Sequence, residues 1–186
     1  MGNDVAVDSK FKITGSIEER YGTEPNHSLE VEYTQTDDDR VLVGVGLRAK
    51  SDNITTMHLK YARIDENGNV DTEDTELVKE GTDPNHQLEV WLQCPKQNEV
   101  IVGLGLRAKS DNVTTMRIYT RTLNTDTGKL EHPDEHRGGS EPDHTLEVKG
   151  LPTTEEDITL LRGLGLRMRS DNITTMANFY GKVSPR

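Results

Sequence analysis

The stretch GVGLRAKSDNITTM at Gly44–Met57 occurs three times along this chain. Its copies read GLGLRAKSDNVTTM at Gly103–Met116 and GLGLRMRSDNITTM at Gly163–Met176. A shorter block precedes each copy: EPNHSLEV at 24–31, DPNHQLEV at 83–90 and EPDHTLEV at 141–148. Recurrence at a fixed interval of about 60 residues is typical of one supersecondary unit used repeatedly. The sequence therefore predicts a single domain of three internal repeats, at about 10–65, 66–124 and 125–186.

Composition narrows the class of protein. The 186 residues carry a formal net charge of −11, and 31 % of them are hydrophobic. A unit of about 60 residues is only marginally stable alone, so the repeats are expected to share one core. The acidic charge argues against nucleic acid as a partner, because affinity for a polyanion depends on a basic surface. Cys94 is the only cysteine, so no intrachain disulfide is expected.

Membrane insertion is not expected, because no segment has the length and apolar character of a transmembrane helix. The segment 1–12 is polar and does not resemble a signal peptide. A cytoplasmic location, export by a non-classical route and prior removal of a leader are the alternatives, and the oligomeric state is open.

Alternation of apolar and polar side chains predicts strands. In the first repeat they are expected at about 10–17, 28–33, 40–50 and 55–64. In the third repeat Arg162 interrupts the alternation, so a strand end or a bulge is expected there. The expected faces of the strand 40–50 are Val41, Val43, Val45 and Leu47 on one side and Leu42, Gly44, Gly46 and Arg48 on the other.

Three four-stranded units with pseudo-threefold symmetry define an all-β fold, either a β-prism or a β-trefoil. The run from Gly44 to Leu59, with G-x-G-L-R, an aspartate and then T-T-M-x-L, resembles the repeat of vitelline membrane outer layer protein I. That resemblance implies a β-prism of three Greek-key sheets, an architecture shared with jacalin-type lectins. It does not extend to the short block, and the family is rich in disulfides where this chain has one cysteine. The resemblance favours the prism.

The paired glycines, such as Gly44 and Gly46, leave one face of a strand without side chains. One interpretation is a shallow floor on which a flat ligand, such as a sugar ring, lies beside a cation. The other is close packing against a neighbouring segment or a bend in the strand, which are the common uses of glycine in strands.

Arg48, Arg107 and Arg167 occupy equivalent positions in an otherwise acidic chain. Arginine forms bidentate hydrogen bonds with carboxylate, phosphate and sulfate groups, so three such sites could bind a sulfated or sialylated glycan. The alternative is an ion pair within each repeat, for instance with Asp52 or Glu30, since surface ion pairs are common and weak.

The Ser-Asp-Asn-x-Thr-Thr segment that follows each arginine carries the groups of a sugar site. Asp and Asn can accept from and donate to neighbouring sugar hydroxyls, and Thr adds a hydroxyl and a methyl group. The same side chains could instead hold a hairpin turn. The predicted ligand-binding residues are Arg48, Asp52, Asn53, Thr55, Arg107, Asp111, Asn112, Thr114, Arg167, Asp171, Asn172 and Thr174.

Residues of the short block are predicted to support these sites from a second layer. Residues three apart face opposite sides of a strand, so His27 and Glu30 are not expected to converge on a metal. One carboxylate per site is too few for calcium, and neither a metal nor a cofactor is predicted. The predicted supporting residues are His27, Glu30, His86, Glu89, His144 and Glu147.

No enzyme is predicted, because the chain shows no nucleophile–base spacing, no phosphate-binding loop and no His/Cys metal cluster. The leading hypothesis is a non-catalytic, multivalent carbohydrate-binding protein with one glycan site per repeat and glycans or glycoconjugates as partners. Aromatic residues make up 4 % of the chain, so such a lectin would bind mainly through polar groups. The alternative is a structural or assembly protein, such as a coat or matrix component, in which the motif serves only the fold.

Overall fold

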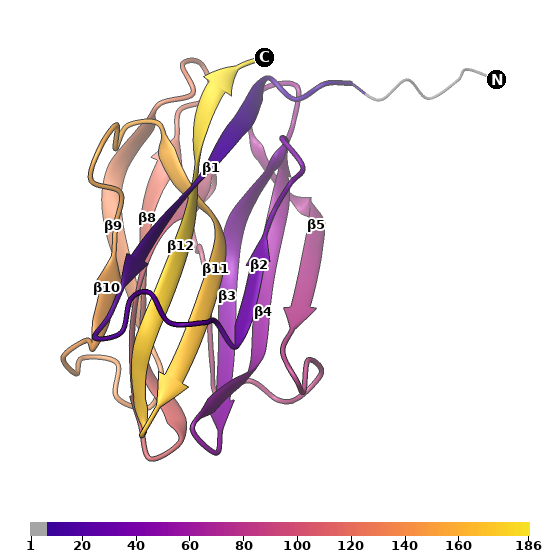
Figure 1. The fold of residues 1–186 in the computed structure, drawn as a ribbon. Helices are drawn as coiled ribbons and strands as arrows, with labels where there is room; N and C mark the ends of the chain where they lie inside the picture. The colour runs from indigo at the N-terminus through magenta and orange to yellow at the C-terminus, as the bar shows by residue number, and fades with distance from the viewer. Residues whose placement is uncertain (1–6) are drawn as a thin grey trace.

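A computed structural model describes residues 7–186 (Figure 1). Residues 1–6 of the polar opening segment lie outside them. The described part of the chain consists of strands and connecting loops, and it contains no helix that could span a membrane. The strands are β1 (Phe11–Tyr21), β2 (Val31–Thr34), β3 (Arg40–Lys50), β4 (Asn53–Ile64), β5 (Val70–Glu80), β6 (Val90–Gln93), β7 (Glu99–Lys109), β8 (Asn112–Leu123), β9 (Leu130–Gly138), β10 (Val148–Gly150), β11 (Thr159–Arg169) and β12 (Asn172–Pro185).

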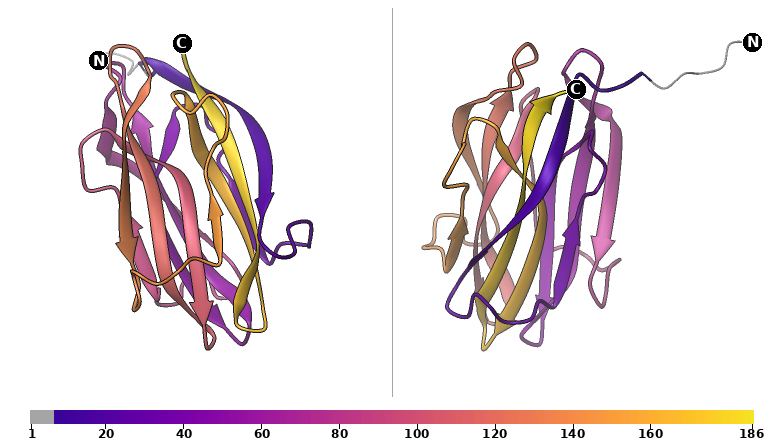
Figure 2. Two further views of the ribbon diagram at one scale, coloured as in Figure 1. Left: turned by 90° about the vertical axis from the view of Figure 1, so that its left-hand side faces the viewer. Right: turned by 45° about the horizontal axis from the view of Figure 1, so that its top comes forward.

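These strands form three four-stranded antiparallel sheets that enclose a common interior (Figure 2). The strand orders are β5-β4-β3-β6, β10-β7-β8-β9 and β1-β12-β11-β2. Each sheet has a long hairpin at its centre and a short strand at one edge. Three such sheets around a pseudo-threefold axis form a β-prism, which confirms the predicted fold class.

Every sheet combines strands from two sequence repeats. The hairpin β3–β4 pairs with β5 and β6, which follow it in the chain, and β7–β8 pairs with β9 and β10 in the same way. The hairpin β11–β12 has no strands after it, so it pairs with β1 and β2 from the start of the chain. The register Phe11↔Pro185 joins the two ends of the described chain. No repeat builds a sheet from its own strands alone, so the repeats depend on one another for folding.

A β-bulge precedes the paired glycines of every central hairpin. The bulge expected at Arg162 is present, between Leu161 and Gly163 in the β11–β12 pairing. The same register shift occurs at Val43 in β3 and at Val102 in β7. Arginine at this position is therefore not the cause of the bulge, which belongs to the repeated backbone.

The bulge changes which side chains share a face. Val41 and Val43 belong to one buried cluster, whereas Val45 and Leu47 belong to the other, together with Leu42. The prediction that Val41, Val43, Val45 and Leu47 lie on one side of the strand was therefore wrong. A bulge places one extra residue in a strand, so every side chain beyond it changes face. The prediction assumed strict alternation along the whole strand and therefore missed this change.

The larger buried cluster contains residues from all three sheets and is the common core. The repeated methionines Met57, Met116 and Met176 are each 0 % exposed. Their recurrence in the long block therefore reflects packing of the core.

Candidate functional site

The three Ser-Asp-Asn turns gather at one end of the prism, away from both termini (Figure 1). In the first turn Lys50 pairs with Asn53, and the two residues between them, Ser51 and Asp52, have φ of 52° and 64°. Positive φ at both central positions is the mark of a type I′ hairpin turn, whose twist matches that of the flanking strands. The amide Nδ2 of Asn53 donates to the carbonyl oxygen of Ser51 at 2.9 Å. Asn53 therefore holds the turn that its motif forms.

The turn aspartates Asp52, Asp111 and Asp171 cap one another, and we call them the aspartate ring. The backbone N–H of Asp52 donates to Oδ1 of Asp111 at 2.9 Å, and that of Asp111 donates to Oδ1 of Asp171 at 3.1 Å. The N–H of Asp171 donates to Oδ1 of Asp52 at 2.9 Å and closes the cycle. Three hairpin tips from distant parts of the chain are tied together in this way.

Carboxylate oxygens of the aspartate ring lie within 4.8 Å of one another. The hydrogen bond to the Asp52 carboxylate raises the pKa of Asp171, and the backbone N–H of Asp171 lowers the pKa of Asp52. Three convergent carboxylates could hold a cation, but one oxygen from each gives three ligands, fewer than the six to eight that Ca²⁺ takes. The sequence indicated one carboxylate per site, because the three aspartates are about 60 residues apart. The absence of a bound metal stays a prediction.

Glutamates of the short blocks connect neighbouring sheets. Glu30 Oε1 accepts the backbone N–H of Met168 at 2.7 Å and that of Ile54 at 3.2 Å. One carboxylate therefore joins a strand of the third repeat to a hairpin of the first. The equivalent acceptors are Glu89 for Ala49 (2.7 Å) and Val113 (3.1 Å), and Glu147 for Ala108 (2.7 Å) and Ile173 (3.2 Å).

The histidines of the short blocks lie on the surface instead. His27, His86 and His144 are exposed, and the ring Nδ1 of His27 contacts the hydroxyl of the adjacent Ser28 at 3.2 Å. Glu30 therefore binds backbone N–H groups between two sheets, whereas His27 faces solvent.

Each short block packs against a hairpin from another copy of the long block. The backbone N–H of Glu30 donates to Leu166 O at 2.9 Å, and that of Glu24 donates to Thr174 O at 3.0 Å. His27 therefore belongs with the hairpin of Arg167. In the same way the loop of His86 lies beside Arg48, whose Nη1 donates to Gln87 O at 3.3 Å. Sequence order alone would have grouped these residues within one repeat.

The repeated arginines are free of carboxylate partners. Within residues 7–186, no ion pair involves Arg48, Arg107 or Arg167. All three are partly buried, and the Nε atoms of Arg107 and Arg167 are buried with no hydrogen-bond partner. The alternative of an ion pair with Asp52 or Glu30 does not form, and both carboxylates accept backbone N–H groups.

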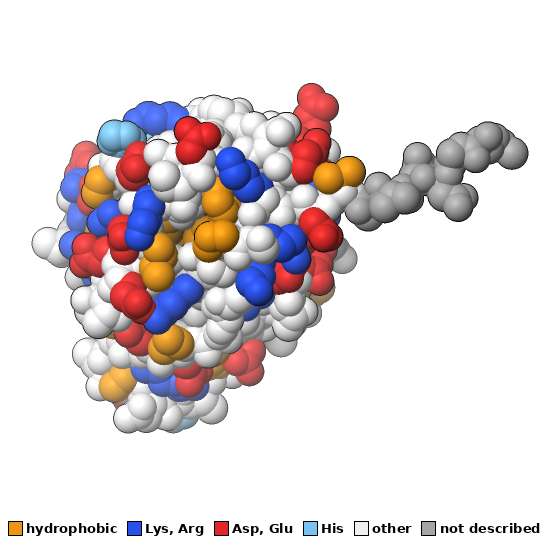
Figure 3. All heavy atoms as spheres, turned by 90° about the horizontal axis from the view of Figure 1, so that it is seen from above, with side chains coloured by type: hydrophobic (Ala, Val, Ile, Leu, Met, Phe, Trp, Pro, Cys, Tyr) orange, Lys and Arg blue, Asp and Glu red, His pale blue; other side chains and the backbone are white. Residues whose placement is uncertain are grey.

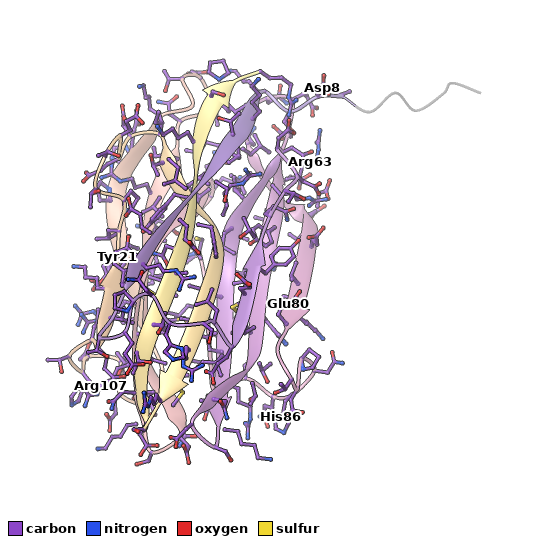
Figure 4. The ribbon with its side chains drawn as sticks, viewed as in Figure 1. Asp8, Tyr21, Arg63, Glu80, His86 and Arg107 are labelled. Atoms are coloured by element: carbon purple, nitrogen blue, oxygen red, sulfur yellow. The ribbon has the colours of Figure 1, made fainter. Side chains whose placement is uncertain are left out.

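Several cations elsewhere on the molecule are paired with carboxylates. Seen from the end that carries the termini, basic and acidic side chains lie side by side (Figure 3). Arg186 contacts Asp38 at 2.7 Å, and Arg63 contacts Asp39 at 3.2 Å. At the hairpin end, towards which Arg107 and His86 lie in Figure 4, the outer cation Arg169 reaches Glu24 at 3.2 Å. Arg117 and Arg162 also lack a carboxylate partner, but their guanidinium groups donate to backbone oxygens, at 2.7 Å to His144 O and 2.6 Å to Gly15 O.

The predicted threonines are less accessible than a sugar site needs. Thr55, Thr114 and Thr174 are 8 %, 7 % and 7 % exposed, and their hydroxyls have no hydrogen-bond partner. The next threonine serves the fold, since Thr56 Oγ1 donates to Asp83 O at 2.7 Å.

The paired glycines make room for side chains of the protein itself. A Cβ atom on Gly46 would lie 2.4 Å from Leu88 Cδ1. The same holds for Gly105 with Leu146 at 2.5 Å and for Gly165 with Leu29 at 2.4 Å. A leucine of the short block thus covers each second glycine. The packing interpretation of the glycines is confirmed at these three positions.

Comparison with solved structures finds two proteins to which this chain is similar. Malaysian banana lectin is 13 % identical, with a TM-score of 0.42, and the match covers 92 % of this chain and 100 % of that one. Calystegia sepium agglutinin is 10 % identical, with a TM-score of 0.46, covering 90 % of this chain and 94 % of that one. No protein-family model and no curated protein matches the sequence. The three-sheet topology of the chain itself identifies the fold.

Proposed function

We propose that this protein is a non-catalytic, multivalent carbohydrate-binding protein with one glycan site per repeat at the hairpin end. The observation that carries the proposal is the set of unpaired arginines, Arg48, Arg107 and Arg167. A partly buried guanidinium without a carboxylate partner is costly unless another acceptor completes it. At Arg107 and Arg167 the buried Nε atom also has no hydrogen-bond partner.

The groups around each arginine suit a glycan that carries a carboxylate or a sulfate. The guanidinium can take the anionic group with two parallel hydrogen bonds. Ser51 and the carbonyl of the Asn53 side chain lie on the same exposed turn and can bind sugar hydroxyls. The exposed His86, on the loop that contacts Arg48, adds a ring nitrogen. Three weak sites of this kind would gain affinity together on a multivalent surface.

The aspartates and glutamates have a different part in this proposal. Asp52 and Glu30 each use one carboxylate oxygen to hold the protein's own backbone, so they position the hairpin and the loop. Ligand contact is thereby assigned mainly to the arginine and to the exposed turn. The arginines and the acidic residues can therefore be tested separately.

A glycan array that includes sulfated and sialylated structures tests the proposal, with and without EDTA. The test variant is R48Q/R107Q/R167Q, and the expected result is at least a tenfold loss of array signal with the melting temperature retained. The control K96Q/K129Q/K182Q removes the same charge from lysines with exposed side chains and surface ion pairs. Binding that survives the arginine changes, or that is lost equally in the control, would contradict the proposal.

A structural or assembly role is the second candidate function. It is favoured by the aspartate ring and the glutamate bridges, which show that much of the repeated motif stabilises the prism. If the role is structural, no glycan on the array binds the protein, and the variant D52A/D111A/D171A has a lower melting temperature. A positive array with unchanged affinity in that variant would assign the aspartates to the fold and the arginines to the ligand.

A further inference from the structure

A groove on the outer face of the sheet β5-β4-β3-β6 lies apart from the hairpin-end sites. Its volume is about 440 Å³, within the range of about 300–1,000 Å³ that small-molecule sites occupy. Trp91 and Leu77, two of its lining residues, are 38 % and 48 % exposed, and together they form an exposed apolar pair. We call it the Trp91 groove, and its lining residues are His58, Lys60, Thr75, Leu77, Leu88 and Trp91.

The other two sheets provide an internal comparison, because they share the backbone but not these side chains. Trp91 stands opposite Gly46, and the equivalent positions opposite Gly105 and Gly165 hold Lys149 and Glu32. The fold therefore accepts a charge where this sheet has tryptophan.

The same is true at the other wall of the groove. Leu77 pairs with Lys60, whereas the equivalent strand positions hold Glu135 and Glu18. An exposed apolar residue is thus present twice on one sheet and replaced by charge on both others. Neither Trp91 nor Leu77 is required by the prism, so the fold does not explain them.

Paired glycines hold the indole of Trp91 in place. A Cβ on Gly44 would lie 2.7 Å from Trp91 Cη2, and one on Gly46 would lie 2.8 Å from Trp91 Cε3. The six-membered ring therefore spans both glycines and rests on the β3 backbone. A ring fixed in this way loses little conformational entropy when a ligand stacks on it.

Polar groups accompany the ring. Lys60 Nζ donates to Gln93 Oε1 at 3.1 Å, and His58 Nε2 contacts Pro84 O at 2.7 Å. Thr75 adds an exposed hydroxyl. An immobilised aromatic face beside amino, amide and hydroxyl groups matches a pyranose, which has apolar C–H faces and a polar rim.

From these observations we infer that the Trp91 groove binds a neutral mono- or disaccharide unit by stacking of a pyranose ring on Trp91. This inference rests on the proposed carbohydrate-binding function for the class of ligand, but it concerns a separate site that only one sheet carries. A second copy of the chain is a poorer fit, because three apolar side chains beside Lys60 fall short of the roughly 800 Å² per partner of a stable interface.

Trp91 is the only tryptophan, so intrinsic fluorescence reports on the groove directly. Maltose, cellobiose, lactose and the methyl glycosides of glucose, galactose and mannose would each be titrated into the full chain. A saturable change in emission is expected with at least one of them, at a Kd on the order of 1 mM. The variant L77E keeps Trp91 as the fluorescent reporter. It places in the groove a glutamate, the residue type found at the equivalent positions Glu135 and Glu18 of the other sheets. It is expected to weaken the response at least tenfold, whereas I17E, the same change at the exposed Ile17 of β1, is expected to leave it intact.

Three results would overturn the inference: no saturable change with any saccharide, an equal response in L77E, or an emission shift that follows protein concentration without sugar. The last would identify a contact between copies. The variant R48Q/R107Q/R167Q separates this site from the hairpin end. If that variant keeps its array signal but the Trp91 response saturates, the hairpin-end proposal fails and the groove stands. If instead the variant loses its array signal and the Trp91 emission shows no saturable change with any saccharide, the hairpin-end proposal stands and the groove inference fails.

Discussion

The glutamate bridges allow a quantitative prediction about stability. Glu89 Oε1 accepts the N–H of Ala49 at 2.7 Å from one hairpin and that of Val113 at 3.1 Å from the next. Hydrogen bonds to a charged acceptor contribute about 1.5–3 kcal/mol each, so two give an upper bound of about 3–6 kcal/mol. Glu89 is only partly buried, and water can replace part of this. We expect Glu89→Ala to lower the free energy of unfolding by roughly 2–4 kcal/mol.

A second substitution separates the hydrogen bonds from the charge. The amide oxygen of Glu89→Gln can still accept both N–H groups, so this variant is expected to lose only about 1 kcal/mol. Both variants would be measured by urea unfolding, with an unchanged m-value taken as the sign of an unchanged native and unfolded state. Glu66→Ala, at an exposed loop position, is the control.

The reasoning would be refuted if Glu89→Ala stayed within about 0.5 kcal/mol of the wild type, the range of ordinary surface substitutions. It would also fail if the glutamine variant were as unstable as the alanine variant. In that case the charge, and not the bridging geometry, would account for the stability of the sheet junction.

Two further predictions concern the glycines and the aspartate ring. Gly46→Ala brings a Cβ to 2.4 Å from the flexible end of Leu88 and is expected to cost about 1–3 kcal/mol in urea unfolding. Gly81→Ala should cost more than about 3 kcal/mol, because φ is +114° and the Cβ would lie 2.1 Å from the backbone oxygen of Thr55; equal costs would contradict this. The raised pKa of Asp171 means that its stabilising contribution, present at low pH, is lost as pH rises through the folded-state pKa. Asp171→Asn should therefore raise the melting temperature near neutral pH and lose this advantage below about pH 3.9, and a difference independent of pH would count against the coupling.

Local features of the structure followed well from the sequence. The predicted strand 40–50 coincides with β3, and the hairpin turn at Ser51 and Asp52 lies where the Asx-turn chemistry of the motif places it. The bulge at Arg162 was also visible as an interruption of the alternation. These features depend on residues within a few positions of one another, so the local pattern contains the information.

The strand 28–33 shows where the local pattern becomes insufficient. Its observed counterpart, β2, begins only at Val31, because the preceding residues form the loop that carries Glu30 to Met168 and Ile54. Those two partners are 138 and 24 residues away in the chain. Periodicity describes a strand but does not identify its partners.

The sequence by itself determined the threefold repeat, the all-β class and the residues that line the hairpin end. Only the tertiary structure decided that each sheet combines two repeats, that Asp52, Asp111 and Asp171 meet in a ring, and that the repeated arginines are left without carboxylates. The physical reason is that a repeat cannot bury its apolar face alone. The pairing that closes the core therefore joins segments from opposite ends of the chain, and that closure sets which polar groups bind the protein's own backbone and which are left without a carboxylate partner.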